Sequence, residues 1–255
     1  MPAPLTLRTE VRGPLSVHCV EEFREFGVDA FVTDRFGGVS PAPYDSLNLA
    51  SHVGDDIENV LENRRRVADA LGVGTQELVI VRQVHGSNVL DVSDASPTSE
   101  ADGLFASRSD LALVMLVADC VPILLVDDES SDFAVVHAGW RGLSSRVLAN
   151  AVAKFQVPAR LHAFIGPCIS GEGYQVGPEV VRHFIGIDGA VSPDAGDRSR
   201  LDLRRVAASQ LLGLGVDDAL TRVSTQSTDG GGLFFSDRAQ RPCGRFALVA
   251  RRVLA

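Results

Sequence analysis

The sequence predicts a mixed α/β (α+β) fold, in which a single sheet-centred domain spans residues 1–255 and helices flank the sheet. Short apolar runs recur along the chain, and helix-type patterns lie between them. No internal repeat, low-complexity tract or interdomain linker interrupts this order. A chain of 255 residues can bury a substantial core as one domain.

The strands are predicted from apolar runs that are nearly continuous rather than alternating. Such runs are typical of strands that are covered on both faces. The predicted strands are 78–84, 111–117, 121–126, 133–137, 161–165 and 246–250. The sequence does not settle their order in the sheet.

The helices are predicted from apolar stripes and capping residues. Residues 56–71 carry such a stripe, with Asp55 as the expected cap and Gly72 as the expected stop. Asp202 is expected to cap a second helix at 202–212. The remaining predicted segments are a helix at 143–155 and loops at 93–99, 188–199 and 227–232.

Composition narrows the classes of function. The formal net charge of −9 argues against nucleic acid or an anionic membrane as the main partner. No segment has the length and apolarity of a transmembrane helix, and residues 1–10 lack the apolar stretch of a signal peptide. The four cysteines are widely spaced and form no disulfide-like pattern, so we expect a cytoplasmic protein with reduced thiols.

His85, Cys120 and His137 are the strongest candidates for chemistry. Each lies at the carboxyl end of an apolar run, where ligands bind in open α/β sheets. Two imidazoles and one thiolate can bind zinc and leave its fourth position open, which is typical of a catalytic site. Three readings stay open at this point: a zinc site, a Cys–His nucleophile pair, and a buried core thiol beside hydrogen-bonded histidines.

The segment H-A-G-W-R-G, which begins at His137, predicts a close backbone approach. Small residues flank Trp140, and Arg141 is expected to open the following helix. An arginine at a helix start suits an anion such as phosphate, although a capped strand-to-helix turn explains the same pattern. His52 is expected either to line a pocket or to stabilise a turn. Cys168 is expected either to supply a further sulfur or to mark a turn.

Taken together, the motifs resemble the bacterial peptidoglycan editing factor family, also called the laccase-domain or multicopper polyphenol oxidoreductase family. They span nearly the whole chain in the expected order. The motifs are T-D-R-F-G-G-V-S (33–40), Y-D-S-L-N-L-A-S-H-V-G-D-D (44–56), R-Q-V-H-G-S-N-V (82–89), E-A-D-G-L (100–104), A-D-C-V-P-I-L-L-V-D (118–127), H-A-G-W-R-G (137–142), I-G-P-C-I (165–169), Y-Q-V-G (174–177), L-F-F-S-D-R (233–238) and C-G-R-F-A (243–247).

The resemblance implies that His85, Cys120 and His137 bind one zinc ion. It further implies purine nucleoside phosphorylase activity, accompanied by adenosine deaminase and methylthioadenosine phosphorylase activities. The implied fold is shared distantly with cytotoxic necrotizing factor toxins, whose site is a Cys–His deamidase. The chain departs from the family near its end, where Ser224 and Thr225 replace a Cys-Thr pair and Cys243 replaces a threonine.

The multicopper name can be tested on the sequence. Six histidines with no H-x-H pair are too few for a four-copper oxidase. A blue-copper site needs two His, one Cys and usually an axial Met, for which the chain offers Met1 and Met115. Copper could still replace zinc at the same three ligands.

The leading hypothesis is therefore a zinc-dependent enzyme of purine nucleoside metabolism. Its partners would be a nucleoside and phosphate. Arg35 and Arg141 are candidates to hold phosphate, because a guanidinium matches its oxygens in pairs. Asn48 and Gln83 are candidates to contact ribose or base.

Asp102 and Asp119 are candidates to relay a proton or to orient the ligand histidines.

Three alternatives remain. One is a metal-free Cys–His hydrolase or deamidase that uses Cys120 and His137. A second is a copper-dependent polyphenol oxidase. A third is a non-catalytic factor linked to peptidoglycan precursor editing. The sequence leaves the oligomeric state unknown.

Overall fold

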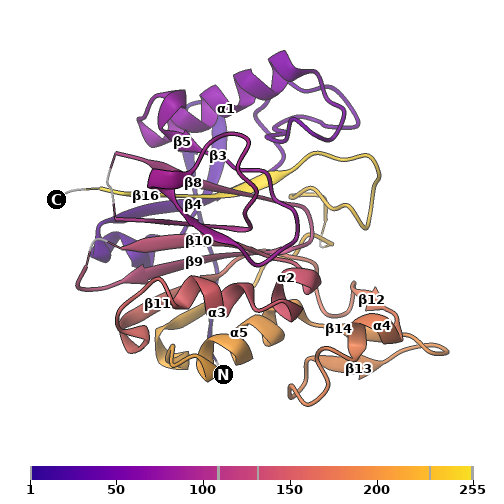
Figure 1. The fold of residues 1–255 in the computed structure, drawn as a ribbon. Helices are drawn as coiled ribbons and strands as arrows, with labels where there is room; N and C mark the ends of the chain where they lie inside the picture. Colours follow the sequence, from indigo (N-terminus) through magenta and orange to yellow (C-terminus); the bar gives the residue numbers. More distant parts are fainter. Residues whose placement is uncertain (1, 108–109, 131, 230, 254–255) are drawn as a thin grey trace.

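The computed structural model describes residues 2–107, 110–130, 132–229 and 231–253. Its main body has four layers, in which two stacked sheets are covered by helices on their outer faces (Figure 1). The predicted mixed α/β class with flanking helices is confirmed, although two large sheets replace the single sheet centre that the apolar runs suggested. None of the helices in these described ranges is long and apolar enough to cross a membrane.

The first large sheet has seven strands. Strand β9 pairs antiparallel with β10 and β11, and β15 pairs parallel with β11. The order across the sheet is β1 (Ala3–Leu5), β15 (Thr221–Ser224), β11 (Leu161–Ile165), β9 (Val121–Asp127), β10 (Phe133–Ala138), β7 (Gly103–Ala106) and β6 (Val89–Asp91).

The second large sheet has six strands. It is antiparallel except for its last pair, β8 with β5. The order across the sheet is β2 (Arg8–Arg12), β3 (Leu15–Cys19), β4 (Val28–Thr33), β16 (Phe246–Arg252), β8 (Ala112–Val117) and β5 (Leu78–Val79).

A third, small sheet lies to one side of the four layers (Figure 1). It consists of β12 (Gln175–Val176), β14 (Ser199–Leu201) and β13 (Val191–Pro193), with helix α4 (Pro178–Val181) nearby. The prediction of a loop over 188–199 is wrong in part, because β13 and the first residue of β14 lie in it.

The layering explains why the strand sequences are continuously apolar. The core between the two sheets includes Phe133 of β10 and Phe246 of β16, both fully buried. A second core lies between the seven-stranded sheet and its helices, and a third lies between the six-stranded sheet and α1 (Ile57–Leu71). Every residue of β8, β9 and β10 is buried, as expected for strands covered on both faces.

The predicted helix over 56–71 is confirmed, but its cap is not Asp55. The carboxylate of Asp56 accepts the backbone N–H of Glu58 at 3.0 Å, so Asp56 is the N-cap. Asp55 instead accepts hydrogen bonds from the side chains of Ser40 and Asn48. The helix ends at Gly72, whose φ of 70° is left-handed as a C-cap requires.

The helices against the seven-stranded sheet show one confirmed and one corrected prediction. Helix α5 (Leu203–Gly213) begins after Asp202, which accepts the N–H groups of the following turn. The predicted helix over 143–155 is instead α2 (Trp140–Ser144) followed by α3 (Val147–Val152). The break falls at Arg146, whose φ of 67° cannot continue a right-handed helix.

The remaining short helices are of the 3-10 type. They span Glu21–Phe26, Thr75–Glu77, Val92–Asp94, Pro158–Arg160 and Asp218–Leu220.

The predicted strand over 78–84 is mostly absent. Only Leu78 and Val79 pair with β8, and Arg82 adds an isolated bridge to Glu100. The chain then turns because the carboxylate of Asp102 accepts the N–H groups of residues 84–86, which a sheet ladder would otherwise use.

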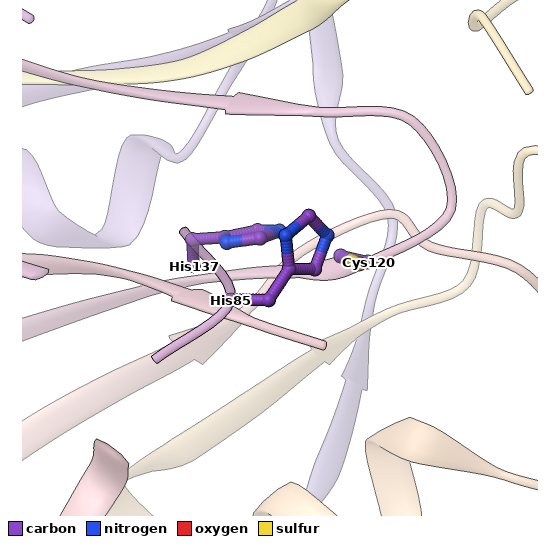
Figure 2. Close-up of side chains that lie close together, drawn as sticks. All are labelled: His85, Cys120 and His137. Atoms are coloured by element: carbon purple, nitrogen blue, oxygen red, sulfur yellow. The ribbon is translucent and has the colours of Figure 1, made fainter. Parts of the chain in front are cut away.

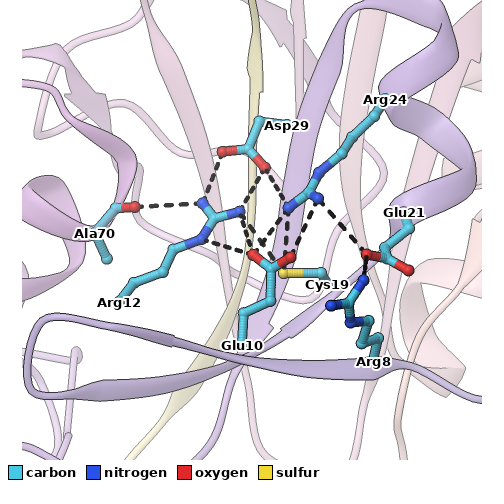
Figure 3. Close-up of polar contacts among 8 residues, drawn as sticks. All are labelled: Arg8, Glu10, Arg12, Cys19, Glu21, Arg24, Asp29 and Ala70. Atoms are coloured by element: carbon cyan, nitrogen blue, oxygen red, sulfur yellow. Dashed lines mark hydrogen bonds and ion pairs between the residues drawn. The ribbon is translucent and has the colours of Figure 1, made fainter.

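An ion-pair network connects β2 to Asp29 of β4 and to Arg24 of the 3-10 helix Glu21–Phe26 (Figure 3). Arg12 donates to both carboxylate oxygens of Asp29, at 2.7 and 2.8 Å, and Arg24 donates to both oxygens of Glu10. Cys19 lies buried among these groups, and its burial raises the pKa of the thiol to about 11. A thiol that stays protonated makes Cys19 a structural residue.

Candidate metal centre

His85, Cys120 and His137 lie together at one end of the stacked sheets. Their ligand atoms all lie within 4.8 Å of one another. The two imidazole rings meet edge to face with centroids 4.8 Å apart, and the thiol of Cys120 lies beside them (Figure 2). Within the described ranges, this is the one group of three or more His, Cys, Asp or Glu residues placed to hold a metal ion.

The connection between the two sheets brings Cys120 to His137. Strand β8 ends at Val117 in one sheet, and β9 begins at Val121 in the other. Cys120 is the last residue of that connection. Because β9 and β10 run antiparallel, with His137 opposite Pro122, the end of β10 lies next to the start of β9.

Asp102 connects the other two candidate ligands. Its carboxylate accepts the backbone N–H of His85 at 2.9 Å and that of Gly86 at 2.7 Å. The same carboxylate bonds to Nδ1 of His137 at 2.8 Å, which leaves Nε2 as the free ring nitrogen. Burial raises the pKa of Asp102, but the hydrogen bond to His137 and the backbone N–H groups outweigh it and lower the pKa overall. Asp102 therefore holds the ring of His137 and the backbone at His85, an arrangement that suits a residue that orients ligand histidines.

Cys120 and His137 perturb each other strongly. Burial raises the pKa of Cys120, but the charge of His137 and the hydrogen bonds from both histidines outweigh it and lower the pKa to about 6. Burial lowers the pKa of His137, but the Cys120 thiolate and Asp102 outweigh it and raise the pKa to about 9. The metal-free pair is therefore a thiolate beside an imidazolium at neutral pH.

The backbone approaches the thiol closely, as the H-A-G-W-R-G segment predicts. A Cβ atom at Gly139 would lie 2.8 Å from Sγ of Cys120, which is shorter than real contacts allow. His85 and Asp119 have left-handed φ values of 59° and 84°. Non-glycine residues rarely adopt this conformation, and it often marks functional sites.

A cavity of about 380 Å³ opens beside the three residues, within the range of small-ligand sites. Its lining carries four arginines but two aspartates. The lining residues are His52, Gln83, His85, Leu116, Val117, Ala118, Asp119, Cys120, His137, Trp140, Arg141, Tyr174, Asp237, Arg238, Arg241 and Arg245.

Two of the four predicted substrate-binding residues line this cavity. The guanidinium of Arg141 lies 4.5 Å over the ring of Trp140, and it forms no ion pair with any described residue. Gln83 lines the cavity too, but its amide bonds to both backbone groups of Leu116, at 2.7 and 2.9 Å. Gln83 thereby fixes the backbone of Leu116, which also lines the cavity.

The other two predicted residues lie outside the cavity lining. Arg35 donates to Asp45 and lies 4.8 Å from the ring of Phe235. Asn48 is fully buried, and its side-chain oxygen accepts the N–H of Arg245 at 3.0 Å. Both hold loops near the site, and Asn48 does so next to a lining arginine.

The sequence reasoning did not select Tyr174, Asp237, Arg238, Arg241 or Arg245. Four of them lie in the motifs Y-Q-V-G, L-F-F-S-D-R and C-G-R-F-A, which supported the family resemblance without being assigned roles, whereas Arg241 lies between two motifs.

The structure also locates the other residues that the sequence singled out. His52 lines the cavity. Cys168 is fully buried, donates to the backbone oxygen of Ile169, and has its pKa raised by burial. Ser224 accepts the N–H of Gln226, and Cys243 lies under the guanidinium of Arg245.

The structure does not place Met115, a possible axial copper ligand, at the site. Met115 is fully buried in β8 and absent from the cavity lining, and Met1 lies outside the described residues.

Comparisons with known proteins agree with these motifs. A family model described as multi-copper polyphenol oxidoreductase laccase matches residues 29–252. A purine nucleoside phosphorylase of Corynebacterium glutamicum is 36% identical over 229 residues, which is 85% of this chain and 91% of the relative. The purine nucleoside phosphorylase YfiH of Escherichia coli is 35% identical over 231 residues, which is 87% of this chain and 92% of the relative.

Among solved structures, YlmD from Geobacillus stearothermophilus matches with a TM-score of 0.90 and 30% identity. The match covers 98% of this chain and 100% of that one. A YfiH protein of Bacillus licheniformis matches with a TM-score of 0.88 and 29% identity, over 95% of this chain and 98% of that one. The resemblance inferred from the motifs is thus confirmed, and the chain belongs to the multi-copper polyphenol oxidoreductase laccase family.

Proposed function

We propose that this protein is a zinc-dependent purine nucleoside phosphorylase. Its substrates would be phosphate and inosine, guanosine, adenosine or methylthioadenosine, with adenosine deamination as a second activity. One observation carries the proposal: a His–Cys–His group lies in the wall of a cavity whose lining is rich in arginine. The relatives named purine nucleoside phosphorylases support the reaction class.

The donor set fits zinc. Two imidazole nitrogens and one thiolate are ligands that zinc prefers, and ligand atoms around a tetrahedral zinc lie about 3.5 Å apart. The three donor atoms all lie within 4.8 Å of one another, so small side-chain movements would bring them to that spacing. The lowered pKa of Cys120 supplies the thiolate at neutral pH. A zinc ion held here would supply a Lewis acid with an open fourth position.

Copper chemistry is less well supported. A multicopper oxidase needs several copper centres, whereas the described ranges hold a single group of three candidate ligands. Copper in place of zinc at these ligands remains compatible with their chemistry. Polyphenol oxidation, which the family's name suggests, is therefore not the proposed activity.

Arg141 is the proposed phosphate-binding residue. Its guanidinium is exposed, lines the cavity and has no carboxylate partner among the described residues. By contrast, Arg241 and Arg245 both pair with Asp237. An unpaired guanidinium can bind two phosphate oxygens at once.

Phosphate-dependent turnover tests the proposal. We expect purified protein to release hypoxanthine from inosine only when phosphate is present, and Cys120→Ala to abolish this release. Arg141→Lys keeps the charge but loses the planar fork, so KM for phosphate should rise about tenfold. Deamination of adenosine needs no phosphate and should suffer less. Equal losses in both reactions would indicate that Arg141 is structural.

A metal-free Cys–His hydrolase is the second candidate, favoured by the thiolate–imidazolium pair of Cys120 and His137. Iodoacetamide labelling of Cys120 distinguishes the two. A metal-bound thiolate resists alkylation, so labelling should be slow until a chelator is added, and purine turnover should return with added zinc. Rapid labelling without chelator, together with turnover that ignores chelators, would favour the hydrolase.

The place of this protein in the cell stays a prediction. We propose a cytoplasmic enzyme of small molecules, without nucleic acid or membrane as a partner. The family resemblance is the basis for a proposed link to the editing of peptidoglycan precursors.

A further inference from the structure

Asp119 joins the metal centre to the C-terminal side of the cavity. It immediately precedes Cys120 and is 8% exposed. One carboxylate oxygen accepts the hydroxyl of Thr228 at 2.5 Å, and the other accepts the backbone N–H of Arg238 at 2.7 Å. The donors lie 109 and 119 residues away in the sequence, so the carboxylate connects distant segments.

The backbone around Asp119 is fixed by further bonds. Its carbonyl oxygen accepts the N–H of Ile169 at 3.1 Å, and Thr228 donates its own N–H to the carbonyl of Cys168 at 3.0 Å. The φ of Asp119 is 84°, a left-handed value that Asp and Asn tolerate better than most residues. Asp119 is thus held by two hydrogen bonds to its carboxylate and one to its backbone carbonyl.

Arg238, whose backbone Asp119 holds, lines the cavity. Its guanidinium lies 5.0 Å from the ring of Tyr174 and donates to the carbonyl of Gln175 at 3.1 Å. Both Arg238 and Tyr174 line the cavity. Burial raises the pKa of Tyr174 to about 12, so its ring stays neutral beside the cation. Flat cationic and aromatic groups of this kind suit a purine base.

We propose that Asp119 is a positioning residue for the nucleoside, acting through Arg238. Its carboxylate fixes the Arg238–Tyr174 wall relative to Cys120 and does not carry the proton of the reaction. The proposal deepens the proposed function and rests on it for the identity of the substrate. Both carboxylate oxygens already accept hydrogen bonds from groups that hold the chain in place, which is the arrangement of a structural anchor.

Substitutions at Asp119 separate anchoring from proton transfer. Asp119→Gly keeps the left-handed backbone and removes both acceptors. Asp119→Asn is the conservative variant: its oxygen can accept the N–H of Arg238, and its NH₂ can donate to the hydroxyl of Thr228, but it cannot take up a proton. Thr228→Val removes one partner from outside the cavity lining, and Thr228→Ser is its matched control.

Three readouts apply to all four variants: amide hydrogen exchange at Arg238, bound zinc, and the separate kcat and KM for inosine at saturating phosphate. We expect Asp119→Gly to speed exchange at Arg238 and to raise KM, each about tenfold, with zinc retained. Thr228→Val should show a smaller change in the same direction. Asp119→Asn and Thr228→Ser should bring the exchange rate at Arg238 and KM back toward the values of the unmodified protein.

Several outcomes would overturn the proposal. A low kcat in Asp119→Asn, with KM and exchange as in the unmodified protein, would assign proton transfer to Asp119. Slow exchange at Arg238 in Asp119→Gly would show that no anchor exists. If the unmodified protein does not cleave inosine, the proposed function fails, but exchange at Arg238 still decides whether the anchor is real.

Discussion

At the scale of single residues, the pair of Cys120 and His137 makes metal binding depend on pH. The pKa of Cys120 is lowered to about 6, so the thiol is already ionised at pH 7 and above. The pKa of His137 is raised to about 9, so its ring still holds a proton that a metal must displace. Metal binding should therefore release one proton from this pair between about pH 7 and pH 9.

Apparent zinc affinity should accordingly rise about tenfold per pH unit in that window and level off above pH 9. Calorimetry in buffers of different ionisation enthalpy measures the released proton directly. A zinc affinity that stays constant from pH 7 to pH 9 would contradict the imidazolium assignment of His137.

A second prediction at this scale concerns Asp102. The two carboxylate oxygens of Asp102 bond to His137 and to three backbone N–H groups. Asp102→Asn would leave a single acceptor oxygen for these four groups. Zinc affinity should fall about 10- to 100-fold, the usual cost of losing such a partner of a ligand histidine. Asp127→Asn is the matched control, because Asp127 is also buried and also accepts backbone N–H groups, but in the turn after β9. An equal loss of zinc affinity in both variants would contradict a specific role for Asp102 in positioning the ligand histidines.

At the scale of elements, the start of α2 is shaped by the thiol beneath it. Gly139→Ala would place a Cβ atom 2.8 Å from Sγ of Cys120, so the thiol or the helix start must move. Zinc affinity in a competition titration with a chelator should fall by at least about tenfold, while the fold is retained. Gly213→Ala at the end of α5 meets nothing within 4 Å and should leave zinc affinity unchanged. Unaltered zinc binding in Gly139→Ala would show that the site tolerates the shift.

The element scale also shows what local patterns can predict. The runs 121–126 and 161–165 matched β9 and β11 closely, because strands buried on both faces leave a continuous apolar signature. The predicted strand over 78–84 is mostly absent because Asp102 takes up the N–H group of Val84 and those of the two residues that follow it, so the chain turns instead of pairing. The short, exposed strand β2 was missed because it has no apolar run.

At the scale of the whole molecule, some residues of the site could be predicted from local sequence and others could not. The three candidate ligands were predictable because each carries its own local context at the end of an apolar run. Arg238 and Arg245 were not, because strand order and the hydrogen bonds of Asp119 and Asn48 bring them to the cavity. Contacts between residues so distant in sequence leave no periodic signal.

The layered architecture also predicts how the molecule responds to metal removal. The three apolar cores pack between the two sheets and between each sheet and its helices. The candidate ligands lie outside them, with Cys120 and His137 at the ends of β9 and β10 and His85 in a turn. Zinc at 100 times its dissociation constant should therefore add about 2.7 kcal/mol to a fold that is stable without it. For a domain of this size, a chelator should lower Tm by roughly 5–10 °C.

Calorimetry and circular dichroism test this last prediction together. The far-ultraviolet spectrum should persist after chelation, because the strands and helices do not depend on the metal. The near-ultraviolet signal of Trp140, the single tryptophan of the chain, should change because its ring lines the same cavity. The Cys120→Ala protein should show neither the Tm shift nor the spectral change. Loss of the far-ultraviolet signal on chelation would instead mean that the metal holds the fold together, as it does in small zinc domains.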